Sequence, residues 1–149
     1  MKNLYDENPE LAEKIMSTME NGNALDEEER KSEALAAYEK AWELLPPDKL
    51  SWDPLSTWVS TSLYNLYFDS SDFRNAKKWA RTALESRSSE LDTGPIVNLG
   101  MACYELHEEE EAYKHFDAAY SFGKERAFKE RPKKYISFYL DKSQNNRKL

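Results

Sequence analysis

A histidine followed by four glutamates is the part of this sequence that comes closest to a catalytic motif. In the metalloprotease helix, two histidines four residues apart bind zinc and a glutamate beside the first acts as the base. Here the residue four positions after His107 is Glu111, so the second zinc ligand is missing. His115 can share a helix face with His107, but the sequence places no third ligand near them. We therefore predict two surface histidines and no metal site.

Cys103 is the only cysteine, and it lies beside Leu99 and Ala102 on the predicted inward face of a helix. A cysteine in such a place is usually a small apolar core residue, so we expect it to be unreactive. One cysteine cannot form a disulfide within the chain, and the first residues do not resemble a signal peptide. These features predict a cytoplasmic protein.

Two runs of acidic residues, 27–29 and 108–111, are the remaining candidates for chemistry. Paired carboxylates can serve as general acid and base, or bind a cation. Each run falls at the end of a predicted helix, where solvent and the helix dipole stabilise acidic side chains. The sequence contains no glycine-turn calcium loop, no glycine-rich phosphate loop and no local Ser, His and Asp motif. We predict no catalytic residue and no cofactor, hence a function other than catalysis.

The composition indicates helices joined by short turns. Only four Gly and six Pro occur in 149 residues, and the mean hydropathy is -0.89. No apolar run approaches the roughly 20 residues that cross a bilayer, so we predict no membrane contact. Residues 1–75 have a net charge of -9 and residues 76–149 have +2. An acidic front half disfavours nucleic acid as a partner, because phosphate binding depends on Lys and Arg.

Apolar periodicity and capping residues predict seven helices. Asn8 is expected to cap the first helix, Asp72 the fourth, and Gly123 the end of the sixth. Pro46 and Pro47 end the second helix, because neither can donate a backbone hydrogen bond. The predicted helices run from about Pro9 to Glu28, Ser32 to Leu45, Pro54 to Asp69, Asp72 to Arg87, Thr93 to Leu106, Glu108 to Phe122, and Lys133 to Lys142. We expect the remaining residues, Ser143 to Leu149, to be frayed.

An internal repeat relates these helices in pairs. Ile96-x2-Leu99-Gly100-x2-Cys103, followed by Ala112-x3-Phe116-x2-Ala119, has two weaker copies, which contain Ala34-x3-Tyr38-x2-Ala41 and Ala76-x3-Ala80-x2-Ala83. Small residues allow the two helices of a unit to cross closely, and large residues fill the gap beside them. Aligning Gly22, Tyr64 and Gly100 gives spacings of 42 and 36 residues, so the first two linkers carry insertions.

The repeat resembles the tetratricopeptide repeat (TPR) family over about Pro9 to Phe122. The resemblance implies an all-α, TPR-type solenoid of helical hairpins in a single domain, 1–149. Its units would cover about 9–45, 54–87 and 93–122, with a capping segment at about 124–142 whose Tyr135, Phe138 and Tyr139 close the open end. Four residues depart from the family pattern: Thr18, Asn21, Tyr64 and Ala80.

A more specific resemblance rests on the segment Ala34 to Lys49, on Trp52, on Ser56-Thr-Trp-Val-Ser60, and on Phe128 to Tyr135 with Phe138. These segments are similar to a group of small bacterial TPR proteins that accompany polymorphic toxins and are taken to be immunity-like. The resemblance implies a protein that binds and neutralises a cognate toxin domain. The alternative is a TPR adaptor or chaperone that holds a peptide segment of a secretion or regulatory partner.

In this family the first helix of each unit, helix A, lines the concave side. The resemblance therefore implies a partner-binding groove that contains Asn23, Asp26, Glu27, Trp58, Asn65, Phe68, Asp69, Met101, Tyr104 and Glu105. Acidic and aromatic side chains suit a basic protein partner, such as a nuclease domain. We expect this chain to be a monomer before it binds that partner. No Lys or Arg lies on these predicted faces, which disfavours a clamp for a peptide carboxylate. Two alternatives remain: Trp58 and Phe68 pack under the linker 46–54, or that linker is itself the binding surface.

Overall fold

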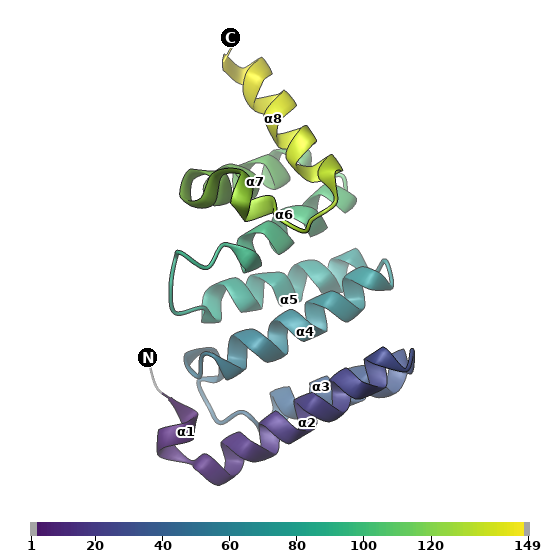
Figure 1. The fold of residues 1–149 in the computed structure, drawn as a ribbon, viewed down its shortest axis with the longest axis vertical. Helices are drawn as coiled ribbons and strands as arrows, with labels where there is room; N and C mark the ends of the chain where they lie inside the picture. The colour runs from purple at the N-terminus through teal and green to yellow at the C-terminus, as the bar shows by residue number, and fades with distance from the viewer. Residues whose placement is uncertain (1–2, 148–149) are drawn as a thin grey trace.

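The computed structural model describes residues 3–147, and this part of the chain is all-helical. Its elements are α1 (Leu4–Glu7), α2 (Pro9–Glu27), α3 (Lys31–Leu44), the 3-10 helix η1 (Lys49–Ser51), α4 (Leu55–Asp69), α5 (Phe73–Ser86), α6 (Gly94–Glu105), α7 (Glu109–Gly123), the 3-10 helix η2 (Lys124–Phe128) and α8 (Lys133–Arg147). Helices α2 and α3, α4 and α5, and α6 and α7 form three antiparallel hairpins that stack along one axis (Figure 1). Helix α8 lies at the far end of the stack.

The turn inside each hairpin has the same backbone geometry. One residue in each turn has a left-handed φ, of 63°, 60° and 65° at Glu29, Ser71 and His107 respectively. The amide of the following residue donates to the carbonyl five positions earlier, at 2.9 Å in all three turns. This pair of features is the Schellman motif, which satisfies carbonyl groups at a helix end. The repeated turn therefore joins the two helices of each hairpin in the same way.

Close packing explains the small residues of the repeat. A Cβ atom on Gly22 would lie 2.5 Å from Cε1 of Tyr38, and one on Gly100 would lie 2.5 Å from Cε1 of Phe116. In the first and third hairpins, the ring on the second helix, helix B, therefore rests against the backbone of helix A. The second hairpin inverts this arrangement, with the large Tyr64 on α4 and the small Ala80 on α5, both buried. Tyr64 and Ala80, which both depart from the TPR pattern, thus compensate for each other: the large residue is on α4 and the small one on α5.

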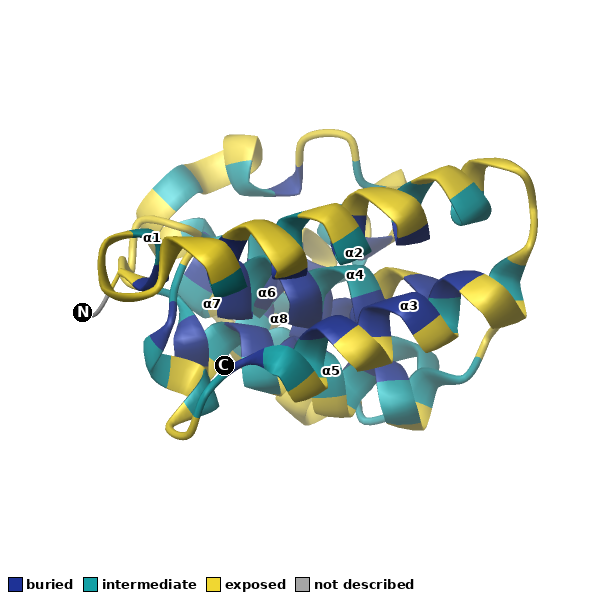
Figure 2. Ribbon diagram, turned by 90° about the horizontal axis from the view of Figure 1, so that it is seen from below, coloured by how far each residue is buried: buried dark blue, intermediate teal, exposed yellow. Residues whose placement is uncertain are grey.

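The apolar core consists of two clusters that meet at the second hairpin. One contains buried residues of α1 to α4 and of the linker that follows α3, and the other joins α4 to α8. Tyr67 and Trp79 pack against both clusters, and the ring of Trp79 meets Trp42 edge to face at 5.2 Å. Figure 2 shows the buried residues of α2 and α3 turned toward the stack and the exposed ones turned outward.

The inserted linker after α3 is ordered by its own side chains. The ammonium group of Lys49 donates to the carbonyl oxygens of Trp42, Glu43 and Leu45 at 2.9, 3.2 and 2.6 Å, and so caps the end of α3. Trp52 is 7% exposed in the first core cluster, and its indole donates to the carbonyl of Pro47 at 3.2 Å. The linker therefore uses Lys49 and Trp52 to hold the first hairpin against the second.

The structure confirms the seven predicted helices and both N-terminal caps, with three corrections. Helix α1 was not predicted; Asn3 caps it by accepting from the amide of Tyr5 at 2.9 Å. Helix α8 extends to Arg147 beyond its predicted end at Lys142, so residues 143–147 are helical, and the end of the predicted frayed segment (148–149) lies outside the described residues. The helix-ending residue after α7 is Lys124, with φ of 53°, while Gly123 keeps a negative φ.

Candidate protein-binding surface

The ten predicted groove residues lie on the A helices, and we call them the A-helix surface. Glu27, Asn65 and Asp69 are exposed, while Met101 is buried. The other six are half-buried: Asn23, Asp26, Trp58, Phe68, Tyr104 and Glu105. Their surroundings differ from one hairpin to the next, because the third hairpin is covered by the C-terminal segment.

On α2, two of the three predicted residues already hold other side chains. The amide oxygen of Asn23 accepts a hydrogen bond from the hydroxyl of Tyr38 at 2.6 Å. The carboxylate of Asp26 pairs with the ammonium group of Lys31 at 2.5 Å. These contacts tie α2 to α3, so Asn23 and Asp26 help to hold the hairpin together. Glu27 is the exposed acid of this group.

On α4, the predicted residues combine exposed polar groups with half-buried rings. Phe68 packs between Tyr64 and Phe73, with ring centroids 5.4 and 5.1 Å away. Trp58 packs against the first core cluster, the cluster that also contains Trp52 of the linker. Asn65 and Asp69 of the same helix are exposed. Helix α4 therefore offers a mixed polar and aromatic face.

On α6, the C-terminal segment occupies the predicted residues. The carboxylate of Glu105 pairs with Lys134 at 2.8 Å and accepts from the hydroxyl of Tyr135 at 2.7 Å. The ring of Tyr104 meets the rings of Tyr135 and Phe138 edge to face. Met101 contacts the guanidinium of Arg131 through its sulfur at 3.3 Å. The part of the A-helix surface that is open to a partner is therefore the part on α2 and α4.

Arg131 and Lys134 contact the A-helix surface, which the sequence analysis did not predict. The guanidinium of Arg131 donates to the side-chain oxygen of Asn98, which is buried in α6. Burial lowers the pKa of Arg131 from its ordinary value. Within residues 3–147, Arg131 has no carboxylate within ion-pair distance. Both residues come from a segment some thirty positions after α6. The available signal was the cluster of Lys and Arg around Pro132, ahead of the aromatic residues of α8.

Buried polar groups of this region have shifted pKa values. Burial by itself would raise the pKa of Glu105, but its hydrogen bonds with Lys134 and Tyr135 hold it below the ordinary value. Burial raises the pKa of Tyr64 well above its ordinary value. The hydroxyl of Tyr64 is buried and has no hydrogen-bond partner in the described part of the chain. Tyr64 therefore stays neutral and contributes mainly its ring.

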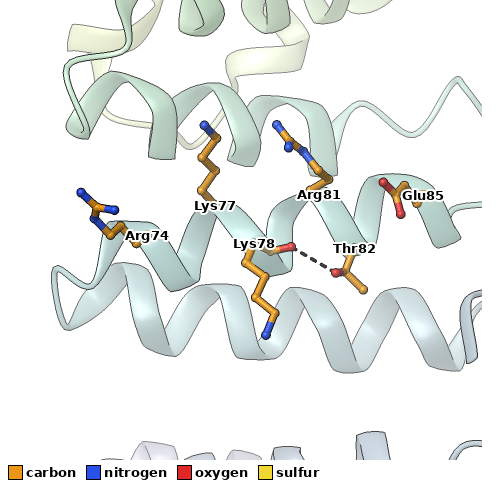
Figure 3. A pocket seen from close by; sticks show the side chains of 6 residues that line it. All are labelled: Arg74, Lys77, Lys78, Arg81, Thr82 and Glu85. Atoms are coloured by element: carbon orange, nitrogen blue, oxygen red, sulfur yellow. Dashed lines mark hydrogen bonds between the residues drawn. The ribbon is translucent and has the colours of Figure 1, made fainter.

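The opposite side of the second hairpin is basic. A shallow depression on α5 is lined by Arg74, Lys77, Lys78, Arg81, Thr82 and Glu85. Figure 3 shows Lys77 and Arg81 pointing to one side of α5 and Lys78 to the other. Lys77 is already paired with Glu108 of the third hairpin at 2.8 Å. Through Lys77, this basic stripe holds Glu108 and Glu111 of the third hairpin close to α5.

Comparisons with known proteins identify the architecture. No protein-family model matches the sequence, and no curated protein matches it either. Among solved structures, the chain is similar to the C-terminal TPR-containing domain of a Plasmodium falciparum protein described as an FK506-binding protein, with 18% identity, 95% coverage of both chains and a TM-score of 0.69. The fold is of the TPR type. At this identity the likeness establishes the fold alone, and the TPR fold is typical of modules that bind other proteins.

No helix between residues 3 and 147 is long and apolar enough to cross a membrane. The exposed residues of the A-helix surface lie on α2 and α4, whereas α8 contacts its residues on α6. The geometry can therefore present acids and aromatic rings to another macromolecule, with Glu27, Asn65 and Asp69 as its exposed polar residues.

Proposed function

We propose that this chain is a non-catalytic protein-binding module that neutralises a cognate toxin domain with a basic surface. The contact would be made by the open A-helix surface of α2 and α4. The observation that carries the proposal is that α2 and α4 present the exposed acids Glu27 and Asp69 together with the half-buried rings of Trp58 and Phe68. Acidic groups at the rim of an interface attract a basic partner, and aromatic side chains supply most of the binding energy.

The charge distribution supports a protein partner over nucleic acid. The front half of the chain has a net charge of -9, and it contains α2 and α4. Phosphate groups would be repelled by this surface. A nuclease domain, which must be basic to hold its own substrate, is the class of toxin that best fits it. We propose a complex with one copy of each chain, formed in the reducing cytoplasm where the single cysteine stays a thiol.

A substitution at the centre of the open surface tests this proposal. Asn65 is exposed on α4, so Asn65→Arg adds bulk and positive charge without removing a core contact. We expect at least tenfold weaker binding to the cognate toxin domain, measured by calorimetry. Ala36→Arg is the matched control, because Ala36 is exposed on α3, a B helix, and the added charge is the same. Equal binding of both variants would place the contact elsewhere.

A second candidate function is favoured by Arg131. Its guanidinium is half-buried beside the A-helix surface and lacks a carboxylate partner within the described residues. An arginine in this state is suited to bind a carboxylate, because a charged partner offsets the cost of burial. This favours a TPR adaptor that holds an acidic peptide. Binding of short acidic peptides that is lost in Arg131→Gln, with no tight binding to a folded basic domain, would select this function.

A further inference from the structure

Three residues with different metal-binding groups meet between α6 and α7, away from the A-helix surface. They are Cys103, Glu111 and His115, and one ligand atom from each lies within 4.8 Å of the other two. The thiol of Cys103 lies 3.9 Å from the nearer carboxylate oxygen of Glu111. Cys103 is fully buried, His115 is half-buried and Glu111 is exposed. The cluster thus has an apolar floor and a side that opens to solvent.

We propose that Cys103, Glu111 and His115 form a binding site for a zinc ion. Thiolate and imidazole ligands favour zinc over magnesium and calcium, which prefer sets of oxygen ligands. In a tetrahedral zinc site, a sulfur and an oxygen ligand lie about 3.6 Å apart, as follows from the usual bond lengths. The observed separation of 3.9 Å requires only a small side-chain movement. Three protein ligands leave the fourth position to a water molecule.

The scaffold holds the ligands in place before any ion binds. Glu111 and His115 are four residues apart on α7, so they share one face of the helix. Cys103 is on α6, the other helix of the same hairpin, and Gly100 and Phe116 pack these helices closely. His107, which the sequence pairs with the acidic run, is instead the left-handed residue of the turn. The histidine proposed to bind the metal is therefore His115. No local sequence motif indicates that it lies close to Cys103.

Protonation and nearby charges set the strength of such a site. Burial lowers the pKa of His115, so its imidazole is neutral and able to bind a metal at neutral pH. Burial raises the pKa of Cys103 to about 11, so zinc must displace the thiol proton, and one proton is released for each ion bound. Lys77 lies 3.6 Å from the carboxylate of Glu111 and competes with the ion. Arg81 also weakens the site, because it lies on the same side of α5 as Lys77 (Figure 3).

Titration of the full chain with cobalt(II), a coloured substitute for zinc, tests the site. We expect a sulfur-to-cobalt charge-transfer absorption that saturates at one ion per chain and disappears when zinc is added in excess. Cys103→Ala and His115→Gln should each lose it. The matched control is Glu110→Gln, since Glu110 belongs to the same acidic run but pairs with Lys142. An absence of absorption in the parent chain, or its retention in Cys103→Ala, would overturn the proposal.

A substitution that strengthens metal binding provides an independent test, because a variant that failed to fold would not bind cobalt more tightly. Lys77→Met removes the cation that competes for Glu111, and we expect it to tighten cobalt binding by about tenfold. Zinc should also raise the melting temperature of the parent chain by about 5 °C or more at a hundredfold excess over Kd. Weaker binding in Lys77→Met, or a melting temperature that zinc does not change, would contradict the site.

Discussion

The tyrosines of the core differ in whether their hydroxyl groups form a hydrogen bond. The hydroxyls of Tyr135 and Tyr139 donate to the carboxylates of Glu105 and Asp117 at 2.7 and 2.6 Å. The hydroxyl of Tyr64 is fully buried and has no hydrogen-bond partner within the described residues. A buried polar group without a hydrogen bond destabilises the folded state, whereas one bonded to a charged group stabilises it.

Removing these hydroxyls should therefore have opposite effects. We expect Tyr64→Phe to leave the free energy of unfolding unchanged or to raise it by about 1 kcal/mol. Tyr135→Phe should lower it by about 1.5 to 3 kcal/mol, because Glu105 loses a hydrogen bond in a half-buried site. Urea denaturation of the two variants measures the difference. Equal losses would show that the hydroxyl of Tyr64 has a partner, such as an ordered water molecule.

At the scale of elements, α8 completes a structure that three hairpins leave open. Tyr135 and Tyr139 of α8 are buried in the second core cluster, and Phe138 is packed against it. Lys134 and Lys142 pair with Glu105 and Glu110 at the two ends of this contact. The segment ahead of α8 adds Phe128, which is 5% exposed and meets the ring of Phe116. The last hairpin thus depends on residues outside the repeat.

Deletion of residues 133–149 should expose the apolar face of the third hairpin. We expect the free energy of unfolding to fall by on the order of 5 kcal/mol, since each large side chain contributes about 1.5 to 3 kcal/mol on burial. Thermal unfolding followed by circular dichroism measures the loss. Deletion of residues 145–149 is the control, because it keeps Tyr135, Phe138 and Tyr139. An unchanged melting temperature in the longer deletion would make α8 a free basic arm.

At the scale of the whole molecule, the acids of the A-helix surface and the basic stripe on α5 lie on different helices. Four acids of that surface differ in what they can do. Asp26 and Glu105 hold Lys31 and Lys134, whereas Glu27 and Asp69 are exposed and have no ion-pair partner among residues 3–147. Only the second pair can attract a partner without loss to the fold.

Neutralising the exposed acids should change how fast a basic partner binds. For Glu27→Gln with Asp69→Asn we expect a several-fold slower association at low salt and a smaller effect of added salt, because rim charges mostly steer the encounter. Dissociation should change little. Stopped-flow or surface-binding kinetics measure both rates. The control is Glu43→Gln with Glu85→Gln on the B helices. An equal slowing in the control would assign the effect to net charge alone.

The sequence by itself determined the all-helical TPR architecture and the helix ends that local chemistry decides. Asn8 and Asp72 cap helices through bonds to residues three positions away, and Pro46 with Pro47 stops α3. Periodic apolar residues and the repeated Gly22 and Gly100 indicate packing that is shared by the first and third hairpins. These signals are local or repetitive, so they can be recognised in a single sequence. Helix α1 was missed because four residues carry too little periodicity.

Only the tertiary structure decided which side chains meet across distant segments. The exchange of Tyr64 with Ala80 is readable as a departure from the repeat, but its compensation depends on two helices packing together. Arg131, Lys134 and Tyr135 reach α6 from about thirty residues away, and so they close part of the surface that the sequence assigned to a partner. Such contacts depend on the angle at which α8 folds back, which is set by packing of the whole stack and by no local pattern.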